Sequence, residues 1–169
     1  MTQMRLHLIV LLSTASQILA APQVDQTTPI TPTNASQIAI TYLQKNQSIT
    51  LSPDQISNLN LIIQDYLSKD TDSPANADRL WFVISAAYQI SNLTLKTETR
   101  VKNTSSLAWE FQNKYWFTGY YGRGFIPLTF ELNYRRFSQI LGIDLLGNPD
   151  AALTQEIGTL ILSLSALKG

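Results

Sequence analysis

The sequence contains no cysteine, and its single histidine, His7, lies close to the amino terminus. The absence of cysteine excludes disulfide scaffolds, thiolate metal sites and cysteine nucleophiles. If the first twenty or so residues are removed, the histidine is lost as well, which excludes histidine-based triads and histidine-ligated zinc. Carboxylates then remain as the groups best able to carry chemistry, and we expect neither a metal nor another cofactor.

Charge is also scarce and balanced. Twelve basic and twelve acidic residues give a formal net charge of zero, and charged residues make up 14% of the chain. This balance gives no electrostatic reason to expect a nucleic acid or an anionic membrane as a partner. Hydrophobic residues make up 44%, and a length of 169 residues favours one globular domain over two.

The amino-terminal residues have the order of a secretory signal. An apolar run at 6–12 follows Arg5, and small and polar residues lead to Pro22. The run is too short to cross a bilayer, and the order is typical of a signal peptide. We assign it to residues 1–21, with a buried first helix as the alternative, and expect a secreted, extracellular protein. Four N-glycosylation sequons agree with a eukaryotic secretory route; they lie at Asn34, Asn46, Asn92 and Asn103.

Helical patterns dominate the remainder. Residues 22–35 are rich in Gln, Thr and Pro and are predicted to form a flexible leader. Ser52 and Gln55 form a capping box that begins a helix. Residues 80–90 are apolar nearly all round, as in a helix at the centre of a domain. Turns or loops are expected at 70–76, 92–106 and 115–124. We predict helices at 36–45, from Ser52 to about Leu67, at 80–90, at 130–141 with Gly142 as the stop, and from Asn148 onward.

Aromatic and glycine residues gather in residues 114–129. Five aromatics occur within seven residues, at 115–121, and two glycines flank Arg123 directly afterwards. Aromatic faces suit stacking on sugar rings, whose C–H faces are apolar while their edges need hydrogen bonds. Glycines allow the backbone to approach a ligand closely. The alternative is that these aromatics form a core under a tight turn.

Residues 120–129 read YYGRGFIPLT, which resembles YYGRGPIQLS/T, the signature of family 19 glycoside hydrolases. Asn133 and Tyr134 continue the resemblance, and LGIDLLGNPD at 141–150 is similar to a second motif of that family. The resemblance implies a mainly α, single, lysozyme-like helical domain over residues 36–169, shortened at its carboxyl end relative to family 19 chitinases. It also implies action on, or binding of, β-1,4-linked N-acetylglucosamine polymers.

The resemblance also assigns site residues. Cleavage with inversion needs a general acid and a general base about 6.5–9.5 Å apart. The stretch FVISAAYQI at 82–90 matches the family's FLAQTSHET, so Gln89 occupies the position of the general acid. Glu110 is the candidate general base, with an exposed surface glutamate as its alternative, and Glu98 is the candidate substitute acid. Tyr120, Tyr121, Arg123, Thr129 and Asn133 match substrate-binding positions, with Arg123 expected to organise the turn.

Glutamine can hydrogen-bond a glycosidic oxygen but cannot deliver a proton. General acid catalysis is typically worth 10²–10⁴ in rate, so we expect hydrolysis to be weak or lost. One alternative is an active inverting endochitinase using Glu110 with Glu98 or another acid. The others are a non-catalytic chitooligosaccharide-binding module or decoy, and a structural remnant. The expected partner is chitin or its oligosaccharides, with peptidoglycan as second choice, and we expect a monomer.

Overall fold

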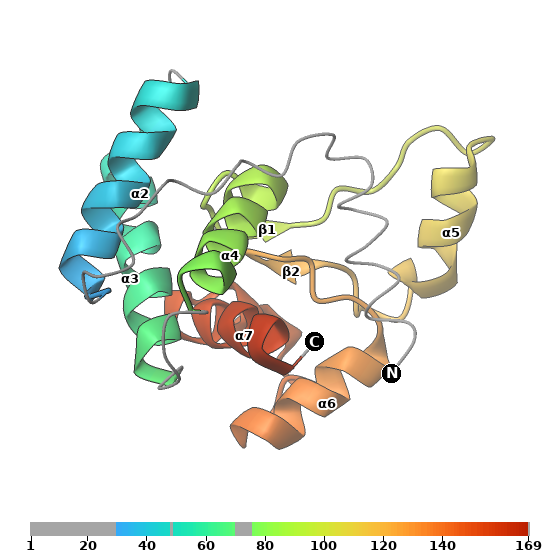
Figure 1. Cartoon of the computed structure of the whole chain (residues 1–169). Coiled ribbons are helices and arrows are strands. Elements are labelled where there is room, and N and C mark those ends of the chain that lie inside the picture. Colours follow the sequence, from blue (N-terminus) through green and yellow to red (C-terminus); the bar gives the residue numbers. More distant parts are fainter. Residues whose placement is uncertain (1–29, 48, 70–75, 169) are drawn as a thin grey trace. The chain divides into compact units, whose positions relative to one another are not determined.

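The computed structural model describes residues 30–47, 49–69 and 76–168 (Figure 1). These residues form six α-helices, one short 3₁₀-helix and one two-stranded sheet, which confirms the mainly α-helical fold class. The predicted signal peptide, and nearly all of the predicted turn at 70–76, lie outside the described residues. Within the described ranges, no helix combines the length and the hydropathy needed to cross a bilayer.

Contacts divide the chain into two compact units where the sequence predicts one domain. The first unit contains the described residues up to Thr94, together with those from Leu162 onward. The second unit is the continuous segment Leu95–Ile161. Every residue of the second unit is described, and the unit contains the motifs with the strongest resemblance to family 19.

Helix α2 (Pro32–Gln47) opens the first unit and is longer at both ends than the helix predicted at 36–45. Thr31 and Asn34 cap it reciprocally. The N–H of Asn34 donates to Thr31 Oγ1 at 3.3 Å, and the N–H of Thr31 donates to Asn34 Oδ1 at 2.7 Å. Because this cap satisfies amino-terminal N–H groups, the helix begins inside the segment that the sequence predicts to be a flexible leader.

Helix α3 (Pro53–Lys69) contacts both α2 and α4 (Asn76–Ser91) in this unit. The predicted capping box is confirmed: the N–H of Gln55 donates to Ser52 Oγ at 3.2 Å, and the N–H of Ser52 donates to Gln55 Oε1 at 2.7 Å. One face of α3 is buried. The prediction of a central apolar helix at 80–90 is confirmed by α4, whose buried hydrophobic residues are Leu80, Trp81, Val83, Ile84, Ala86 and Ala87.

The turn after α4 contains two consecutive residues in the left-handed region. Asn92 and Leu93 both have φ of 56°, and the N–H of Leu93 donates to the Ala87 carbonyl at 3.2 Å. Left-handed backbone is strained for a residue such as leucine. Two amides of α3 help hold the turn, because Gln55 Nε2 donates to the Asn92 carbonyl at 2.9 Å and Asn58 Nδ2 donates to the Leu93 carbonyl at 2.8 Å.

The second unit is built on a small antiparallel sheet. Strand β1 (Lys96–Thr97) pairs with β2 (Arg123–Gly124), and α5 (Leu107–Trp116) lies between them in the sequence. No helix was predicted at the position of α5. Ser106 begins it by accepting a hydrogen bond at Oγ from the N–H of Trp109 at 3.1 Å. Helix α6 (Glu131–Leu141) follows, and the predicted stop at Gly142 is confirmed by its left-handed φ of 67°.

The last predicted helix is wrong in one respect, because it is divided in two. Residues Pro149–Leu153 form the 3₁₀-helix η1, and α7 runs over Gln155–Lys168. Thr154 separates them with an extended backbone, at φ −76° and ψ 147°. Its carbonyl accepts from the N–H of Gly158 at 2.9 Å, so Thr154 ends one helix and begins the next.

The capping box of α3 gives a first prediction. Ser52→Ala removes the acceptor for the N–H of Gln55 and should lower the free energy of unfolding by about 1 kcal/mol. Ser57→Ala is the matched control, because Ser57 is exposed within α3 and alanine is the better helix former there. Urea denaturation measures both variants. Equal stability of Ser52→Ala and wild type would contradict the capping assignment.

Candidate functional site

The part of segment 114–129 that follows α5, residues 118–129, is called the aromatic–glycine turn from here on, and it needs glycine at two positions. A Cβ at Gly122 would lie 2.6 Å from the Cβ of Pro127 and 3.2 Å from the Cβ of Glu98, so no side chain fits there. Gly124 has φ of +107°, a conformation that side-chain-bearing residues rarely adopt. The turn can therefore close against Glu98 only because a glycine stands at 122.

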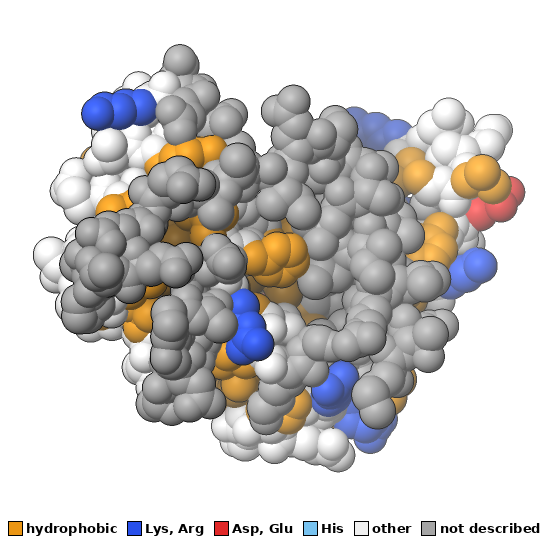
Figure 2. All heavy atoms as spheres, viewed as in Figure 1, with side chains coloured by type: hydrophobic (Ala, Val, Ile, Leu, Met, Phe, Trp, Pro, Cys, Tyr) orange, Lys and Arg blue, Asp and Glu red, His pale blue; other side chains and the backbone are white. Residues whose placement is uncertain are grey.

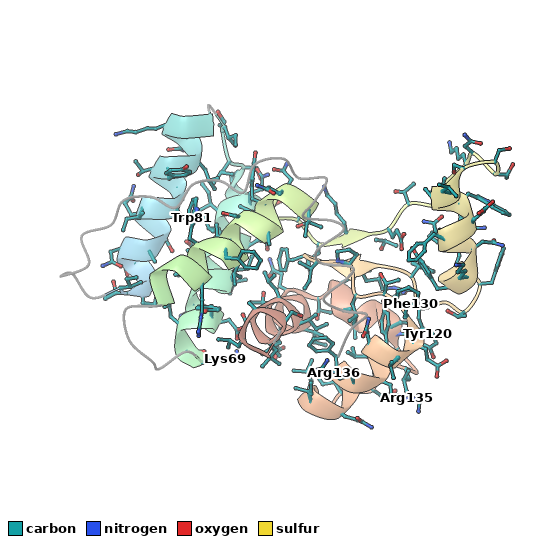
Figure 3. All side chains as sticks on the ribbon, turned by 45° about the vertical axis from the view of Figure 1, so that its right-hand side comes forward. Lys69, Trp81, Tyr120, Phe130, Arg135 and Arg136 are labelled. Carbon is teal, nitrogen blue, oxygen red and sulfur yellow. The ribbon has the colours of Figure 1, made fainter. Side chains whose placement is uncertain are left out.

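Backbone hydrogen bonds fold the turn back on itself. The N–H of Leu128 donates to the Arg123 carbonyl at 3.0 Å, and the N–H of Phe130 donates to the Tyr120 carbonyl at 2.8 Å. Figure 3 shows Tyr120 and Phe130 close to each other beside α6. Phe130 has φ of 72°, which is an outlier for an aromatic residue. Its N–H bond to Tyr120 helps to hold this strained conformation at the start of α6.

The Glu98 carboxylate lies against this turn and accepts three hydrogen bonds. Tyr115 Oη donates to Oε1 at 2.6 Å, Gln112 Nε2 donates to Oε1 at 3.0 Å, and the N–H of Gly122 donates to Oε2 at 2.9 Å. The N–H of Glu98 also donates to the Gly122 carbonyl at 2.7 Å. Hydrogen bonds to a charged acceptor are stronger than neutral ones, so this carboxylate is firmly oriented.

Glu98 differs in burial from the other acidic residues of the second unit. It is half-buried, and Tyr115, its closest donor, is 5% exposed. Burial, and then the hydrogen bond to Glu98, raise the pKa of Tyr115 well above its ordinary value. Tyr115 therefore keeps its proton and remains a donor to Glu98. The remaining carboxylates of Leu95–Ile161 are all exposed: Glu110, Glu131, Asp144, Asp150 and Glu156.

Arg123 is buried at the centre of the turn. Its Nε donates to Asp150 Oδ1 at 2.6 Å. Its Nη1 donates to the carbonyls of Gly119 and Tyr121, at 2.9 and 3.0 Å, and to Tyr134 Oη at 3.0 Å. Tyr134 Oη in turn donates to the Tyr121 carbonyl at 2.8 Å. The Arg123 side chain thus joins the turn, α6 and η1, as a group that organises structure.

The pKa values of Arg123 and of its neighbour Tyr134 are both raised. Burial lowers the pKa of Arg123, but its hydrogen bonds to Tyr134 and Asp150 outweigh this and raise the pKa above the ordinary value. Burial raises the pKa of Tyr134 to about 12, against the opposing effect of the Arg123 charge. Both side chains therefore stay protonated at any physiological pH.

Most of the other predicted binding residues make internal hydrogen bonds. Tyr120 Oη donates to the Leu146 carbonyl at 3.3 Å. Thr129 Oγ1 donates to the Pro127 carbonyl at 3.0 Å, and Asn133 Nδ2 donates to the Thr129 carbonyl at 2.7 Å. These polar groups maintain the turn. The side chains of Tyr120 and Tyr121 stay half-buried beside these polar groups.

Gln89 and Glu110 lie in different units. Gln89 is half-buried in the last turn of α4 in the first unit. Glu110 is exposed in the first turn of α5, and its carboxylate makes no ion pair with any other described residue. The structure brings Glu98 to the aromatic–glycine turn by direct hydrogen bonding and does not bring Glu110 there in this way. The pairing of Gln89 with Glu110 stays a prediction.

Sequence reasoning missed the residues of α5 that hold Glu98. Gln112 and Tyr115 are three positions apart, a spacing that puts both on one helical face. The spacing can be seen in the sequence. That both side chains donate to Glu98 can be inferred only when α5 and the pairing of β1 with β2 are known. Arg100 was also missed, and its guanidinium lies over three aromatic rings.

The sequons differ in their surroundings. Asn92 and Asn103 are exposed, in the turn after α4 and in the loop before α5, while Asn34 is half-buried in α2. Asn46 lies in α2, outside the part whose side chains are described. Glycosylation stays a prediction for all four. Among the described residues, no cluster of acidic side chains has the arrangement of a metal site.

Comparison with curated proteins finds similarity to inactive chitinase-like protein 1 of Hevea brasiliensis, with 50% identity over 38 residues. The matched stretch is 22% of this chain and only 12% of the length of that protein. No family model matches the chain, and no solved structure matches it. The similarity is therefore short, and it points to a chitinase-like protein whose own name describes it as inactive.

The two buried tyrosines give a second prediction. In the unfolded chain tyrosine ionises near pH 10, but folded Tyr115 and Tyr134 retain their protons. The folded state then binds more protons than the unfolded state, so the free energy of unfolding falls as pH rises above 10. Each tyrosine contributes about 1.4 kcal/mol per pH unit, over pH 10–12 for Tyr134.

Urea denaturation between pH 8 and pH 12 measures this slope. Tyr134→Phe and Tyr115→Phe should each flatten it, although both variants lose hydrogen bonds and some stability at pH 8. Phe137→Leu is the control, because it perturbs a buried residue of α6 that has no ionisable group. Its slope should equal that of wild type. A wild-type slope unchanged by either tyrosine substitution would contradict the assignment.

Proposed function

We propose that this chain is a chitinase-like protein that binds β-1,4-linked N-acetylglucosamine saccharides and hydrolyses them weakly or not at all. The observation that carries the proposal is the Glu98 carboxylate, which Tyr115, Gln112 and Gly122 hold against the aromatic–glycine turn. The resemblance at residues 120–150 supports the saccharide class. The similarity to an inactive chitinase-like protein supports the loss of activity.

The geometry favours Glu98 over Glu110 as the carboxylate of the site. Glu98 is half-buried and oriented by three donors, whereas Glu110 is exposed on α5. An oriented carboxylate can accept a hydrogen bond from a sugar hydroxyl, from an acetamide N–H or from a water molecule. In an enzyme the last of these is the role of a general base.

Inverting hydrolysis also needs a proton donor on the opposite side of the scissile bond. The other carboxylates of the second unit are exposed. By resemblance to family 19, the general acid would stand at position 89, where this chain has the amide of Gln89. An amide cannot protonate the departing oxygen. Losing general acid catalysis raises the barrier by about 3–5 kcal/mol, so a bound saccharide leaves intact.

Restoring the acid is the first test. Gln89→Glu should raise the release of reducing ends from soluble chitohexaose by 10²-fold or more over wild type, which itself should show little or none. Gln44→Glu is the matched control, because it adds the same group to an exposed position on α2. Retention of all three proteins on chitin checks binding separately.

The outcomes divide the competing functions. Substantial turnover by wild type supports an active endochitinase and contradicts the proposal. Absence of binding by wild type to chitin and its oligosaccharides contradicts it as well, and binding to peptidoglycan fragments alone would change the ligand. If wild type binds but Gln89→Glu gains no activity, position 89 is not the position of the acid.

Glu98 and Glu110 are separated by a paired substitution. Glu98→Gln keeps the shape of the side chain but removes its charge, and should weaken chitohexaose binding by about 10- to 100-fold, because hydrogen bonds to charged groups are worth about 1.5–3 kcal/mol. Glu110→Gln should change the affinity much less. Calorimetric titration measures both affinities, and circular dichroism checks that each variant is folded.

Tyr115→Phe provides a second measurement in case Glu98→Gln does not fold. It removes one donor to Glu98 and leaves the charge in place, so it should lower the affinity by a smaller factor. A loss of affinity in Glu110→Gln that exceeds the loss in Glu98→Gln would return the carboxylate role to Glu110.

A further inference from the structure

Four residues near α5 form a cluster that the aromatic–glycine turn does not require. The guanidinium of Arg100 lies 4.9 Å from the ring centroid of Phe117, 5.1 Å from that of Trp116 and 5.8 Å from that of Trp109. All three distances are within the range of a favourable cation–π contact. We call Arg100, Trp109, Trp116 and Phe117 the α5 platform.

The platform is fixed in place. Arg100 Nη2 donates to Asn113 Oδ1 at 2.8 Å, which anchors the guanidinium to the middle of α5. Trp109 and Asn113 are four positions apart, and Trp116 follows three positions later, so all three lie on one helical face. A ring held in one orientation loses less conformational entropy when a ligand stacks on it.

The platform is also exposed. Phe117 is 80% exposed, and Trp109 and Trp116 are both half-buried. Figure 2 shows hydrophobic side chains at the surface over α5, beside an acidic side chain. Burying a phenylalanine side chain is worth about 1.5–3 kcal/mol. The Phe117 ring stays in water and is held by the Arg100 cation, an arrangement that favours a role in binding.

Ring stacking connects the platform to the aromatic–glycine turn. Trp116 stacks on Tyr121, with ring centroids 4.6 Å apart and planes at 19°. The guanidinium of Arg123 lies 3.9 Å from the ring centroid of Tyr121. Arg100, Trp116, Tyr121 and Arg123 therefore form one row of contacts, with two stacked rings in the middle and a guanidinium at each end. The exposed platform is continuous with the site that contains Glu98.

We propose that the α5 platform is a sugar-stacking subsite for the same amino-sugar polymer, where Phe117 and Trp109 pack on the C–H faces of sugar units beyond the turn. This inference rests on the proposed function. Flat aromatic rings bounded by hydrogen-bonding groups match a sugar, which is apolar on its faces and polar at its edges. Arg100 acts as a positioning residue that holds the rings.

The combination of a guanidinium with aromatic rings in the α5 platform favours a saccharide as its ligand over a second copy of the chain. A stable protein interface buries about 800 Å² on each partner and has few charges at its centre. The platform has a guanidinium at its centre and is formed by one ten-residue helix with its flanking residues. A saccharide chain, in contrast, needs only a narrow row of rings.

The subsite predicts a dependence on ligand length. Phe117→Ala should weaken binding of chitohexaose about 5- to 10-fold, which corresponds to the loss of one aromatic stacking contact. Binding of chitobiose at the turn should be unchanged. Phe117→Trp should restore the affinity for chitohexaose. Leu132→Ala is the matched control, because Leu132 is 71% exposed on α6 and is outside the platform.

Arg100→Lys tests the positioning role separately. Lysine keeps the charge but lacks the planar guanidinium that stacks on the rings. It should lower the affinity for chitohexaose and leave that for chitobiose unchanged. Calorimetric titration measures affinity, quenching of tryptophan fluorescence by sugar reports contact at the rings, and thermal unfolding shows that each variant is folded.

The outcomes separate this inference from the proposed function. If wild type binds neither chitobiose nor chitohexaose, the proposed function fails and the subsite fails with it. If wild type binds both and Phe117→Ala binds chitohexaose equally well, the subsite is overturned while the proposed function stands. If sedimentation shows a wild-type dimer that Phe117→Ala disrupts, the platform is a contact between copies, which also overturns the subsite.

Discussion

The hydrogen-bonded carboxylate of Glu98 ties together three parts of the second unit. Its donors come from α5, through Gln112 and Tyr115, and from the glycine turn, through the N–H of Gly122. Glu98 itself directly follows β1. A charged acceptor that is half-buried must be satisfied by good donors, or its desolvation would oppose folding. The satisfied carboxylate therefore links α5, the closed turn and the end of β1 to one another.

Arg123 plays the complementary part on the other side of the turn. Its Nε and Nη1 groups donate to Asp150, to Tyr134 and to backbone carbonyls, so these groups stabilise the turn. Tyr120, Thr129 and Asn133, which match substrate-binding positions of the motif, also use their polar groups in internal hydrogen bonds. Under the proposed function, recognition would use the acceptor capacity that three internal hydrogen bonds leave on the Glu98 carboxylate, together with the exposed rings near α5.

Local signals in the sequence predicted the elements that depend on local interactions. The capping box at Ser52 and the glycine stop at Gly142 each involve residues a few positions apart, and the structure confirms both. Helix α5 and the role of Glu98 could not be predicted in this way. The two-residue strand β1 is too short to show a periodic pattern. Gln112 and Tyr115 act by donating to Glu98, which is fourteen or more positions away in the sequence. The motif at 120–129 identified the turn but not the residues that support it.

Under the proposed function, the separation of Glu98 from α4 would allow binding without hydrolysis. None of the three hydrogen bonds that orient Glu98 comes from α4, the helix that contains Gln89. Gln89 therefore takes no direct part in the hydrogen bonds that orient Glu98. Glutamine and glutamate are nearly the same size, so Gln89→Glu should leave no cavity in α4. Inverting hydrolysis would need two groups acting together, whereas the proposed binding needs only an oriented carboxylate and exposed rings, and the second unit contains both.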